Sequence, residues 1–126
     1  MQYSREIQVE GFEAVPPYKR TLKVLLSPRS HRTKNISLGM TILDPGWSSS
    51  PHIHGIEEEL WYVVSGTGRA TVAEETIDID NGTAIYIPPG QRHQLVNNGQ
   101  VQLRVLWVLS PPGLENSYLD RKTGEA

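Results

Sequence analysis

The chain has 126 residues, a length that suits one domain around a single hydrophobic core. It contains no cysteine, which excludes disulfides and thiol chemistry and fits a reducing compartment, so we expect a cytoplasmic protein. The net charge of −2 arises from mixed charges, and no apolar run approaches membrane-spanning length. We therefore expect neither a nucleic acid nor a membrane as a partner.

Residues 21–110 are predicted to form short β-strands, because β-branched and aromatic residues alternate with Gly and Pro turn signals. The dipeptides Asn81-Gly82 and Asn98-Gly99 are typical of two-residue hairpins. No segment shows a helical period of useful length. The pattern predicts an all-β sandwich or barrel, with strands at Thr21–Leu26, Ile36–Leu43, Glu59–Val64, Gly68–Ala73, Thr76–Ile79, Thr83–Ile87, His93–Val96 and Val101–Leu109.

Three of these strands have two distinct faces. In 101–109 the odd positions are all apolar, so that face is expected to pack. In 36–43 the even positions are apolar, and the other face could line a pocket or meet solvent; it carries Ser37, Gly39 and Thr41. In 59–64 an inward Glu59 would bring Trp61 and Val63 inward and leave an apolar outer face of Leu60, Tyr62 and Val64.

The segment Pro51-His52-Ile53-His54 contains two of the four histidines in the chain. On an extended strand, residues two apart point to the same face. His52 and His54 would therefore project together, which is the arrangement that a chelating pair of imidazoles requires.

A third histidine and a carboxylate complete this pattern. Gly55 permits a bend after the histidine pair, so that one of the three consecutive glutamates at 57–59 could reach the same point. His93 follows the stiff turn Pro88-Pro89-Gly90. Three imidazoles and one carboxylate suit divalent iron, manganese, nickel, copper or zinc, and they leave open the positions that a catalytic metal needs. The sequence therefore predicts one divalent transition metal as cofactor.

This pattern resembles the two sequence motifs of the cupin superfamily. The first motif, G-x5-H-x-H-x3-4-E-x6-G, is matched by Gly46, His52, His54, Glu59 and Gly66. The second motif, G-x5-P-x-G-x2-H-x3-N, is matched by Gly82, Pro88, Gly90, His93 and Asn97. The six-residue step to Gly66 selects Glu59 among the three glutamates.

The resemblance implies a small single-domain cupin, with a jelly-roll β-barrel, or double-stranded β-helix, and a metal near its axis. The implied metal ligands are His52, His54, Glu59 and His93, and the other motif residues are implied to form turns. We expect one domain, 1–126, with an N-terminal arm (1–20), a barrel (21–110) and a loose polar C-terminal tail (111–126). Such arms commonly add a strand to a partner's sheet, and the apolar outer face of 59–64 needs cover, so a homodimer is expected.

Four residues are candidates for lining a substrate pocket: Met40, Trp47, Trp61 and Tyr86. The two tryptophans lie beside the implied ligands in sequence, although core packing is an alternative for Trp61. Tyr86 could donate a proton if it faces the metal. His31 is a lone loop histidine that we interpret as a surface residue.

The cupin superfamily includes dioxygenases, decarboxylases, isomerases, lyases and binding proteins, so the resemblance does not select a reaction. We predict a metal-dependent enzyme of one of the first four types that acts on a small oxygenated or carboxylate substrate. No residue stands out as its general acid or base. A small-molecule-binding protein without turnover is the alternative. A storage role is disfavoured, because storage cupins generally lose the histidines that this chain keeps.

Overall fold

The computed structural model describes residues 1–122. Within this range the chain forms ten strands, a short 3-10 helix and one α-helix. In chain order they are η1 (Glu6–Gln8), β1 (Phe12–Ala14), β2 (Arg20–Leu26), β3 (Ser37–Leu43), β4 (His52–Ile53), β5 (Glu58–Ser65), β6 (Gly68–Val72), β7 (Glu75–Ile79), β8 (Ala84–Ile87), β9 (Arg92–Val96), β10 (Leu103–Ser110) and α1 (Asn116–Lys122).

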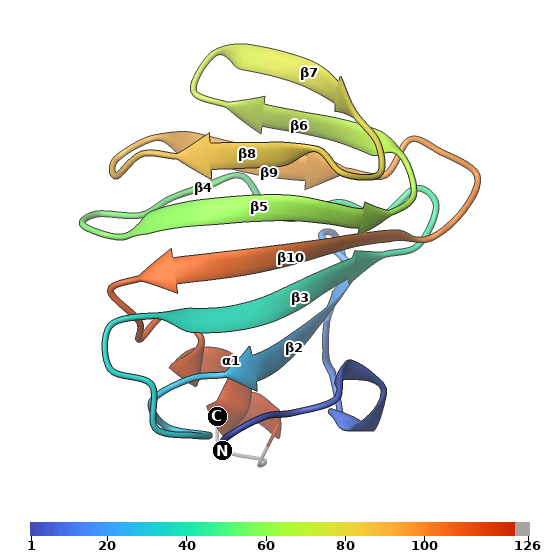
Figure 1. Ribbon diagram of the computed structural model, residues 1–126. Helices are drawn as coiled ribbons and strands as arrows, with labels where there is room; N and C mark the ends of the chain where they lie inside the picture. Colours follow the sequence, from blue (N-terminus) through green and yellow to red (C-terminus); the bar gives the residue numbers. More distant parts are fainter. Residues whose placement is uncertain (123–126) are drawn as a thin grey trace.

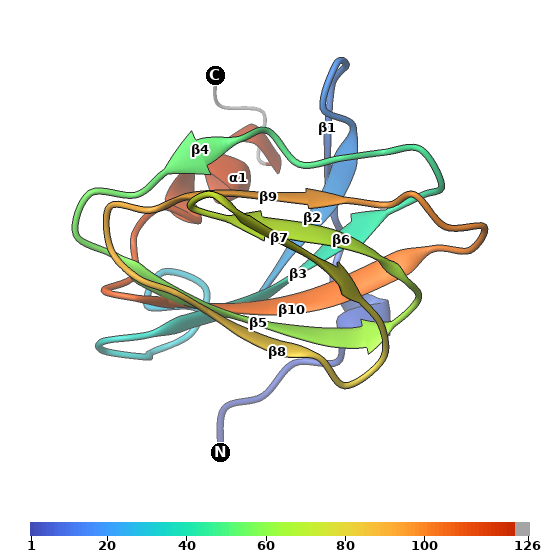
Figure 2. The same ribbon diagram turned by 90° about the horizontal axis from the view of Figure 1, so that it is seen from above.

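The strands form two antiparallel sheets that pack face to face (Figure 1). The larger sheet has the order β1-β2-β3-β10-β5-β8, and the smaller has the order β4-β9-β6-β7. Figure 2 shows the two layers from above, with β4 and β9 opposite the long strands β3, β10 and β5. The predicted all-β architecture is confirmed. All eight predicted strands are present, with ends shifted by one or two residues.

Two strands were not predicted, since β1 has three residues and β4 has two, and neither length supports a two-residue period. Part of the N-terminal arm forms β1. This strand pairs with β2 of its own chain, in the register Phe12↔Leu22. Residues 12–14 therefore extend the chain's own sheet.

The two predicted hairpin dipeptides are not hairpins. Asn81-Gly82 joins β7 to β8, and Asn98-Gly99 lies between β9 and β10; each connection passes from one sheet to the other. The two-residue connection within a sheet is Ala73-Glu74, between β6 and β7, and Ala73 adopts a φ of 55°. Local turn chemistry specifies the backbone conformation of a turn, whereas the packing of the sheets decides which strands it joins.

The motif residues outside the histidine–glutamate set shape turns, as implied. Gly66 has a φ of +95°, and a Cβ there would lie 2.5 Å from the carbonyl oxygen of Gln102. The fully buried Asn97 donates hydrogen bonds to the carbonyl oxygens of Leu43 (2.8 Å) and Val101 (2.9 Å). It thereby connects the corner after β9 to the ends of β3 and β10.

The core lies between the two sheets. The packed face of β10 is confirmed for four residues, which are all buried: Leu103, Val105, Trp107 and Leu109. Val101 precedes the strand and is exposed. On β5 the inward and outward faces are also as predicted. Trp61 and Val63 are buried, while the outer face is half-exposed at Leu60 (50%), Tyr62 (49%) and Val64 (41%).

Both faces of β3 are buried. Its small, polar face points into the barrel, where Gly39 lies opposite Trp107. Its apolar face is covered in part by the N-terminal segment, because Glu6 forms ion pairs with Lys23 of β2 (3.4 Å) and with Arg104 of β10. These two cations flank β3 at the positions of Met40 and Ile42.

The expectation of a loose C-terminal tail is wrong for part of residues 111–122. These residues include α1, which lies beside β1 and β2 and packs Leu119 against the core. The ring of Tyr118 stacks on Phe12, with a centroid distance of 6.0 Å. The segment is too short for a helical period to be visible in the sequence. Residues 123–126 lie outside the described part. None of the helices within residues 1–122 has the length and apolar character to span a membrane.

Gly39 provides a test of the packing between β3 and the Trp107 side chain of β10. A Cβ at this position would lie 2.0 Å from Trp107 Cζ2, and Trp107 is 4% exposed. We expect Gly39→Ala to lower the free energy of unfolding by about 1–3 kcal/mol, because overpacking displaces a buried side chain. Urea denaturation measures this loss. Gly55→Ala is the control, since its Cβ would meet nothing within 4 Å; equal losses in both variants would contradict the packing argument.

Candidate metal centre

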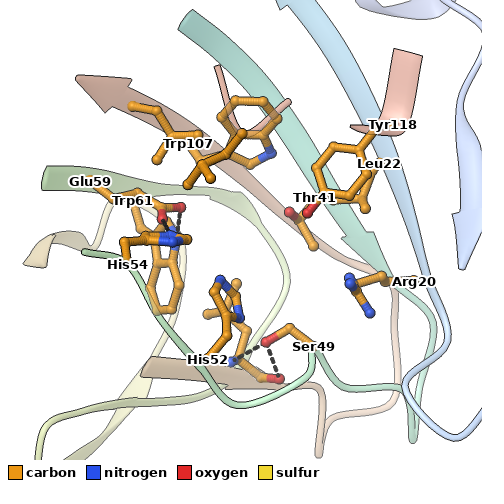
Figure 3. Close-up of a pocket in the computed structure, with 13 residues that line it drawn as sticks. Arg20, Leu22, Thr41, Ser49, His52, His54, Glu59, Trp61, Trp107 and Tyr118 are labelled. Carbon is orange, nitrogen blue, oxygen red and sulfur yellow. Dashed lines mark hydrogen bonds and ion pairs between the residues drawn. The ribbon is translucent and has the colours of Figure 1, made fainter. Parts of the chain in front are cut away.

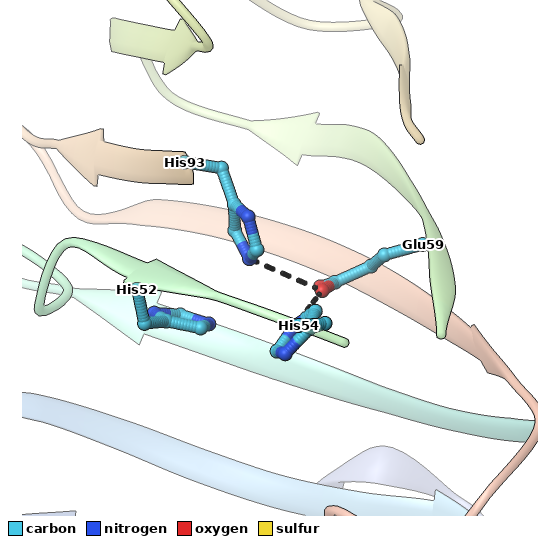
Figure 4. Close-up of side chains that lie close together, drawn as sticks. All are labelled: His52, His54, Glu59 and His93. Carbon is cyan, nitrogen blue, oxygen red and sulfur yellow. Dashed lines mark hydrogen bonds and ion pairs between the residues drawn. The ribbon is translucent and has the colours of Figure 1, made fainter. Parts of the chain in front are cut away.

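The four residues that both motifs single out come together inside the barrel (Figure 4). His52 lies on β4, His54 follows it, Glu59 lies on β5 and His93 lies on β9. One potential ligand atom from each lies within 4.8 Å of the others. Antiparallel pairing sets His52 opposite His93, and their ring centroids are 4.2 Å apart. Of the three consecutive glutamates, only Glu59 belongs to this cluster.

The expected projection of His52 and His54 to one side is observed, with ring centroids 4.7 Å apart. The Pro-Pro-Gly turn contributes to this arrangement, because the Gly90 amide donates a hydrogen bond to the carbonyl oxygen of His54 (2.9 Å). Gly90 adopts a φ of +78°. The turn that precedes β9 therefore also holds the segment that carries His54.

Backbone hydrogen bonds orient two of the imidazoles. His52 Nδ1 lies 2.7 Å from the carbonyl oxygen of Ser50, and His93 Nδ1 lies 2.9 Å from that of Gln91. A carbonyl oxygen only accepts, so both rings donate from Nδ1 and, when neutral, carry the lone pair on Nε2. Second-shell bonds of this kind set the tautomer of metal-binding histidines.

Glu59 is the buried carboxylate of the cluster, at 7% exposure. Its Oε2 accepts a hydrogen bond from Trp61 Nε1 at 2.7 Å, and its Oε1 lies 2.9 Å from His54 Nε2 and 3.5 Å from His93 Nε2. Burial alone would raise the pKa of this carboxyl. The contacts with the two imidazoles and the indole outweigh burial and lower the pKa to about 2. Glu59 is therefore ionised near neutral pH.

His52 is suited to act as a neutral donor. Burial lowers the pKa of His52, and its neighbours His93 and His54 lower it further. His93 Nε2 is fully buried and has no hydrogen-bond partner among the described residues. An unpaired buried imidazole nitrogen beside an ionised carboxylate is a site that a metal cation would satisfy. The donor set is thus consistent with a metal site.

A cavity of about 50 Å³ opens beside the cluster (Figure 3). His52, His54 and Glu59 lie on its wall. The predicted pocket residue Trp61, on β5, also lines it. Other lining residues come from β2, β3, β9, β10, the loop before β4 and the C-terminal segment: Arg20, Leu22, Thr41, Ser49, Leu95, Trp107, Leu109, Leu114 and Tyr118.

The other three predicted pocket residues do not line this cavity. Met40 lies on the outward face of β3, because Thr41 is the neighbour that points into the barrel. Tyr86 is 51% exposed on the outer face of β8, so it does not face the cluster. Trp47 packs against the core edge, with Lys19 Nζ 4.8 Å from its ring centroid. Of the two tryptophans chosen for their proximity to the ligands in sequence, Trp61 lines the cavity and Trp47 does not. Strand parity turns Met40 and Tyr86 away from the cavity.

Several pocket residues were not predicted. Thr41 had a visible signal, because it belongs to the small, polar face of β3 that was left open as a possible pocket wall. Arg20 and Tyr118 had no such signal in the sequence. They lie at the edges of the predicted barrel, and only the pairing of β1 with β2 and the packing of α1 bring them to the cavity.

Comparison with known proteins agrees with this site. A family model described as a cupin domain matches residues 39–109. An uncharacterized protein of Methanocaldococcus jannaschii is 30% identical over 105 residues, which cover 80% of this chain and 84% of that protein. The tetracenomycin polyketide synthase protein TcmJ of Streptomyces glaucescens is 32% identical over 100 residues, which cover 78% of this chain and 67% of that protein.

Solved structures share the fold. The crystal structure of a predicted oxalate decarboxylase from Thermotoga maritima has a TM-score of 0.79 at 22% identity, and the match covers 89% of this chain and 100% of that one. The structure of KdgF from a Halomonas species has a TM-score of 0.79 at 18% identity, with 92% and 98% covered. The chain therefore belongs to the cupin family, and its two facing antiparallel sheets are the jelly-roll, or double-stranded β-helix, that its two motifs implied.

Proposed function

We propose that this protein is a metal-dependent enzyme that acts on a small oxygenated or carboxylate substrate. His52, His54, Glu59 and His93 would hold one divalent transition metal. The observation that carries the proposal is the convergence of four donor atoms within 4.8 Å of one another on the wall of a cavity. A structural metal site would be closed by protein ligands and would need no adjoining cavity.

The donor set limits the metal without naming it. Three imidazoles and a carboxylate suit divalent iron, manganese, nickel, copper or zinc. Four protein ligands leave one or two positions for a substrate oxygen or water in a five- or six-coordinate ion. When bound, such an ion would supply Lewis-acid polarisation of a substrate oxygen, or redox chemistry if it is iron.

The chain's own residues would orient the reacting groups and keep water away from them. The backbone carbonyls of Ser50 and Gln91 hold two imidazoles in place, and the Trp61 indole holds the carboxylate of Glu59. The apolar side chains of Leu95, Trp107 and Leu109 form much of the remaining wall. An apolar wall strengthens electrostatic interactions inside the cavity by excluding water.

The relatives support the enzyme class and leave the reaction open. Their names include a predicted oxalate decarboxylase, a putative sugar phosphate isomerase from Acidithiobacillus ferrooxidans and polyketide synthase proteins of Streptomyces. A shared fold does not transfer a substrate. We therefore keep decarboxylase, isomerase, lyase and dioxygenase chemistry within the proposal. Binding without turnover is the alternative that the assay below distinguishes.

The first expected outcome concerns metal content. Tag-free protein purified without added metal should contain about one equivalent of a transition metal, and His52→Ala should lose it, because four donors are reduced to three. Elemental analysis measures both. His31→Ala is the matched control, since His31 lies outside the cluster and should not alter the metal content. Wild-type protein that stays metal-free after reloading would contradict the proposed site.

The second expected outcome separates catalysis from binding. We expect the metal-loaded protein to convert at least one member of a set of small organic acids, under air, in a reaction that His93→Ala abolishes. One-dimensional NMR of the acids follows product formation, and an oxygen electrode detects dioxygen use. Broadened resonances of an acid without any product would instead support the binding protein.

We also propose that two copies pair through the outer face of the larger sheet. An apolar groove of about 390 Å³ follows β3, β10, β5 and β8 there, and three half-exposed side chains line it: Leu60, Tyr62 and Tyr86. Exposed apolar patches of this kind commonly mark protein–protein contacts.

A charged substitution on this outer face of the larger sheet tests the dimer proposal. We expect wild-type protein to sediment as a dimer, and Leu60→Glu to sediment as a monomer, because pairing would bury the new carboxylate without a partner. Analytical ultracentrifugation measures both. Val101→Glu is the control, since Val101 is 60% exposed before β10 and away from the groove. A monomeric wild type would refute the dimer.

A further inference from the structure

The cavity beside the histidine cluster has a second polar end (Figure 3). Arg20 from β2, Thr41 from β3 and Tyr118 from α1 lie together on the side opposite His54 and Glu59. All three line the same cavity as the candidate metal ligands. A bound molecule that fills the cavity would therefore contact both ends.

The polar groups at this end have few hydrogen-bond partners within the described chain. The Arg20 guanidinium donates one hydrogen bond, from Nη1 to the carbonyl oxygen of Tyr18 at 2.9 Å. Among the side chains that the structure describes, no carboxylate lies within ion-pair distance of it. Most arginines in folded proteins are exposed to solvent, so this observation alone would not identify a binding group.

The two hydroxyl groups provide the second observation. Thr41 is 93% buried, at 7% exposure, yet within residues 1–122 its hydroxyl has no hydrogen bond, and the same is true of the Tyr118 hydroxyl. Ser49 on the same wall differs, because its hydroxyl accepts from the Leu95 amide at 2.8 Å. A guanidinium and two hydroxyls without hydrogen bonds to the protein together offer a positive charge and several donors, which matches an anionic ligand.

The shape of the donor groups and the size of the cavity indicate which class of anion fits this site. A guanidinium presents a planar fork that fits a carboxylate with two parallel hydrogen bonds. The cavity of about 50 Å³ holds about three to five water-sized sites. Bonded atoms lie closer together than waters, so this space suits an acid of about two to four carbons.

We propose that Arg20 binds a carboxylate of the substrate, that Thr41 and Tyr118 donate hydrogen bonds to it, and that the substrate is a short-chain organic acid. The other end of the acid would present an oxygen to the histidine cluster. This inference rests on the proposed function, and it adds the substrate class and a specificity-determining residue. Because Tyr118 belongs to α1, the C-terminal segment takes part in the site.

Titration calorimetry of the metal-loaded protein with four dicarboxylates (oxalate, malonate, succinate and glutarate) tests the proposal, with malonamide as the uncharged probe. We expect at least one acid to bind wild type about 10- to 100-fold more tightly than Arg20→Gln, the range for a charge-assisted pair. Arg20→Lys should fall between them, since it keeps the charge without the fork. Tyr118→Phe and Thr41→Val should each weaken binding by about 2- to 10-fold.

A matched control separates recognition from nonspecific charge effects. Arg69→Gln removes the same charge at a side chain that is 57% exposed and paired with Asp78 at 3.1 Å, outside the cavity. It should bind the acids like wild type. Thermal unfolding of each variant, expected to match wild type, checks that Arg20→Gln acts on binding and not on folding.

The outcomes are distinguishable from a failure of the metal site. Metal content is measured on the same samples. If the protein holds metal and Arg20→Gln binds every acid as tightly as wild type, or no acid binds at all, the carboxylate site is wrong while the metal site stands. If wild type holds no metal, the proposed function fails. The titrations of the metal-free protein then still decide the role of Arg20.

Discussion

The buried carboxylate of Glu59 is the group on which the arrangement of this site depends. A carboxylate at 7% exposure remains charged only if it has partners, and here they are the Trp61 indole and the His54 imidazole. Removing one partner of a buried charged pair typically costs about 3–5 kcal/mol. The need to satisfy this charge therefore constrains the positions of β5 and of the segment after β4, which both contribute a partner.

The central strands of the larger sheet hold this group in place. In β10, Trp107 lies between Gly39 of β3 and Trp61 of β5. The absent side chain of Gly39 makes room for the Trp107 indole, which forms part of the pocket wall. The indoles of Trp61 and Trp107 belong both to the hydrophobic core and to the pocket wall. A substitution that changes the packing of the core would therefore also change the shape of the pocket.

Segments near both ends of the chain contribute residues to the cavity that the two motifs do not include. The motifs supply the histidine–glutamate cluster, whereas β2 and α1 supply Arg20 and Tyr118 on the far side of the cavity. Stacking of Tyr118 on Phe12 ties the C-terminal helix to the N-terminal strand. The cluster that matches the family motifs thus comes from the barrel, and two of the side chains that we propose to bind a carboxylate come from the start of β2 and from α1.

The sequence by itself determined eight of the ten described strands, the direction of side chains along β5 and β10, and the four residues of the cluster. These features depend on two-residue periodicity and on motif spacing, both of which are local or nearly so. The tertiary structure alone decided which strands the glycine turns connect, that β1 pairs within its own chain, and that Met40 and Tyr86 point away from the cavity. It also brought Arg20 and Tyr118 to the site. These outcomes depend on contacts between segments distant in sequence, which no local pattern encodes.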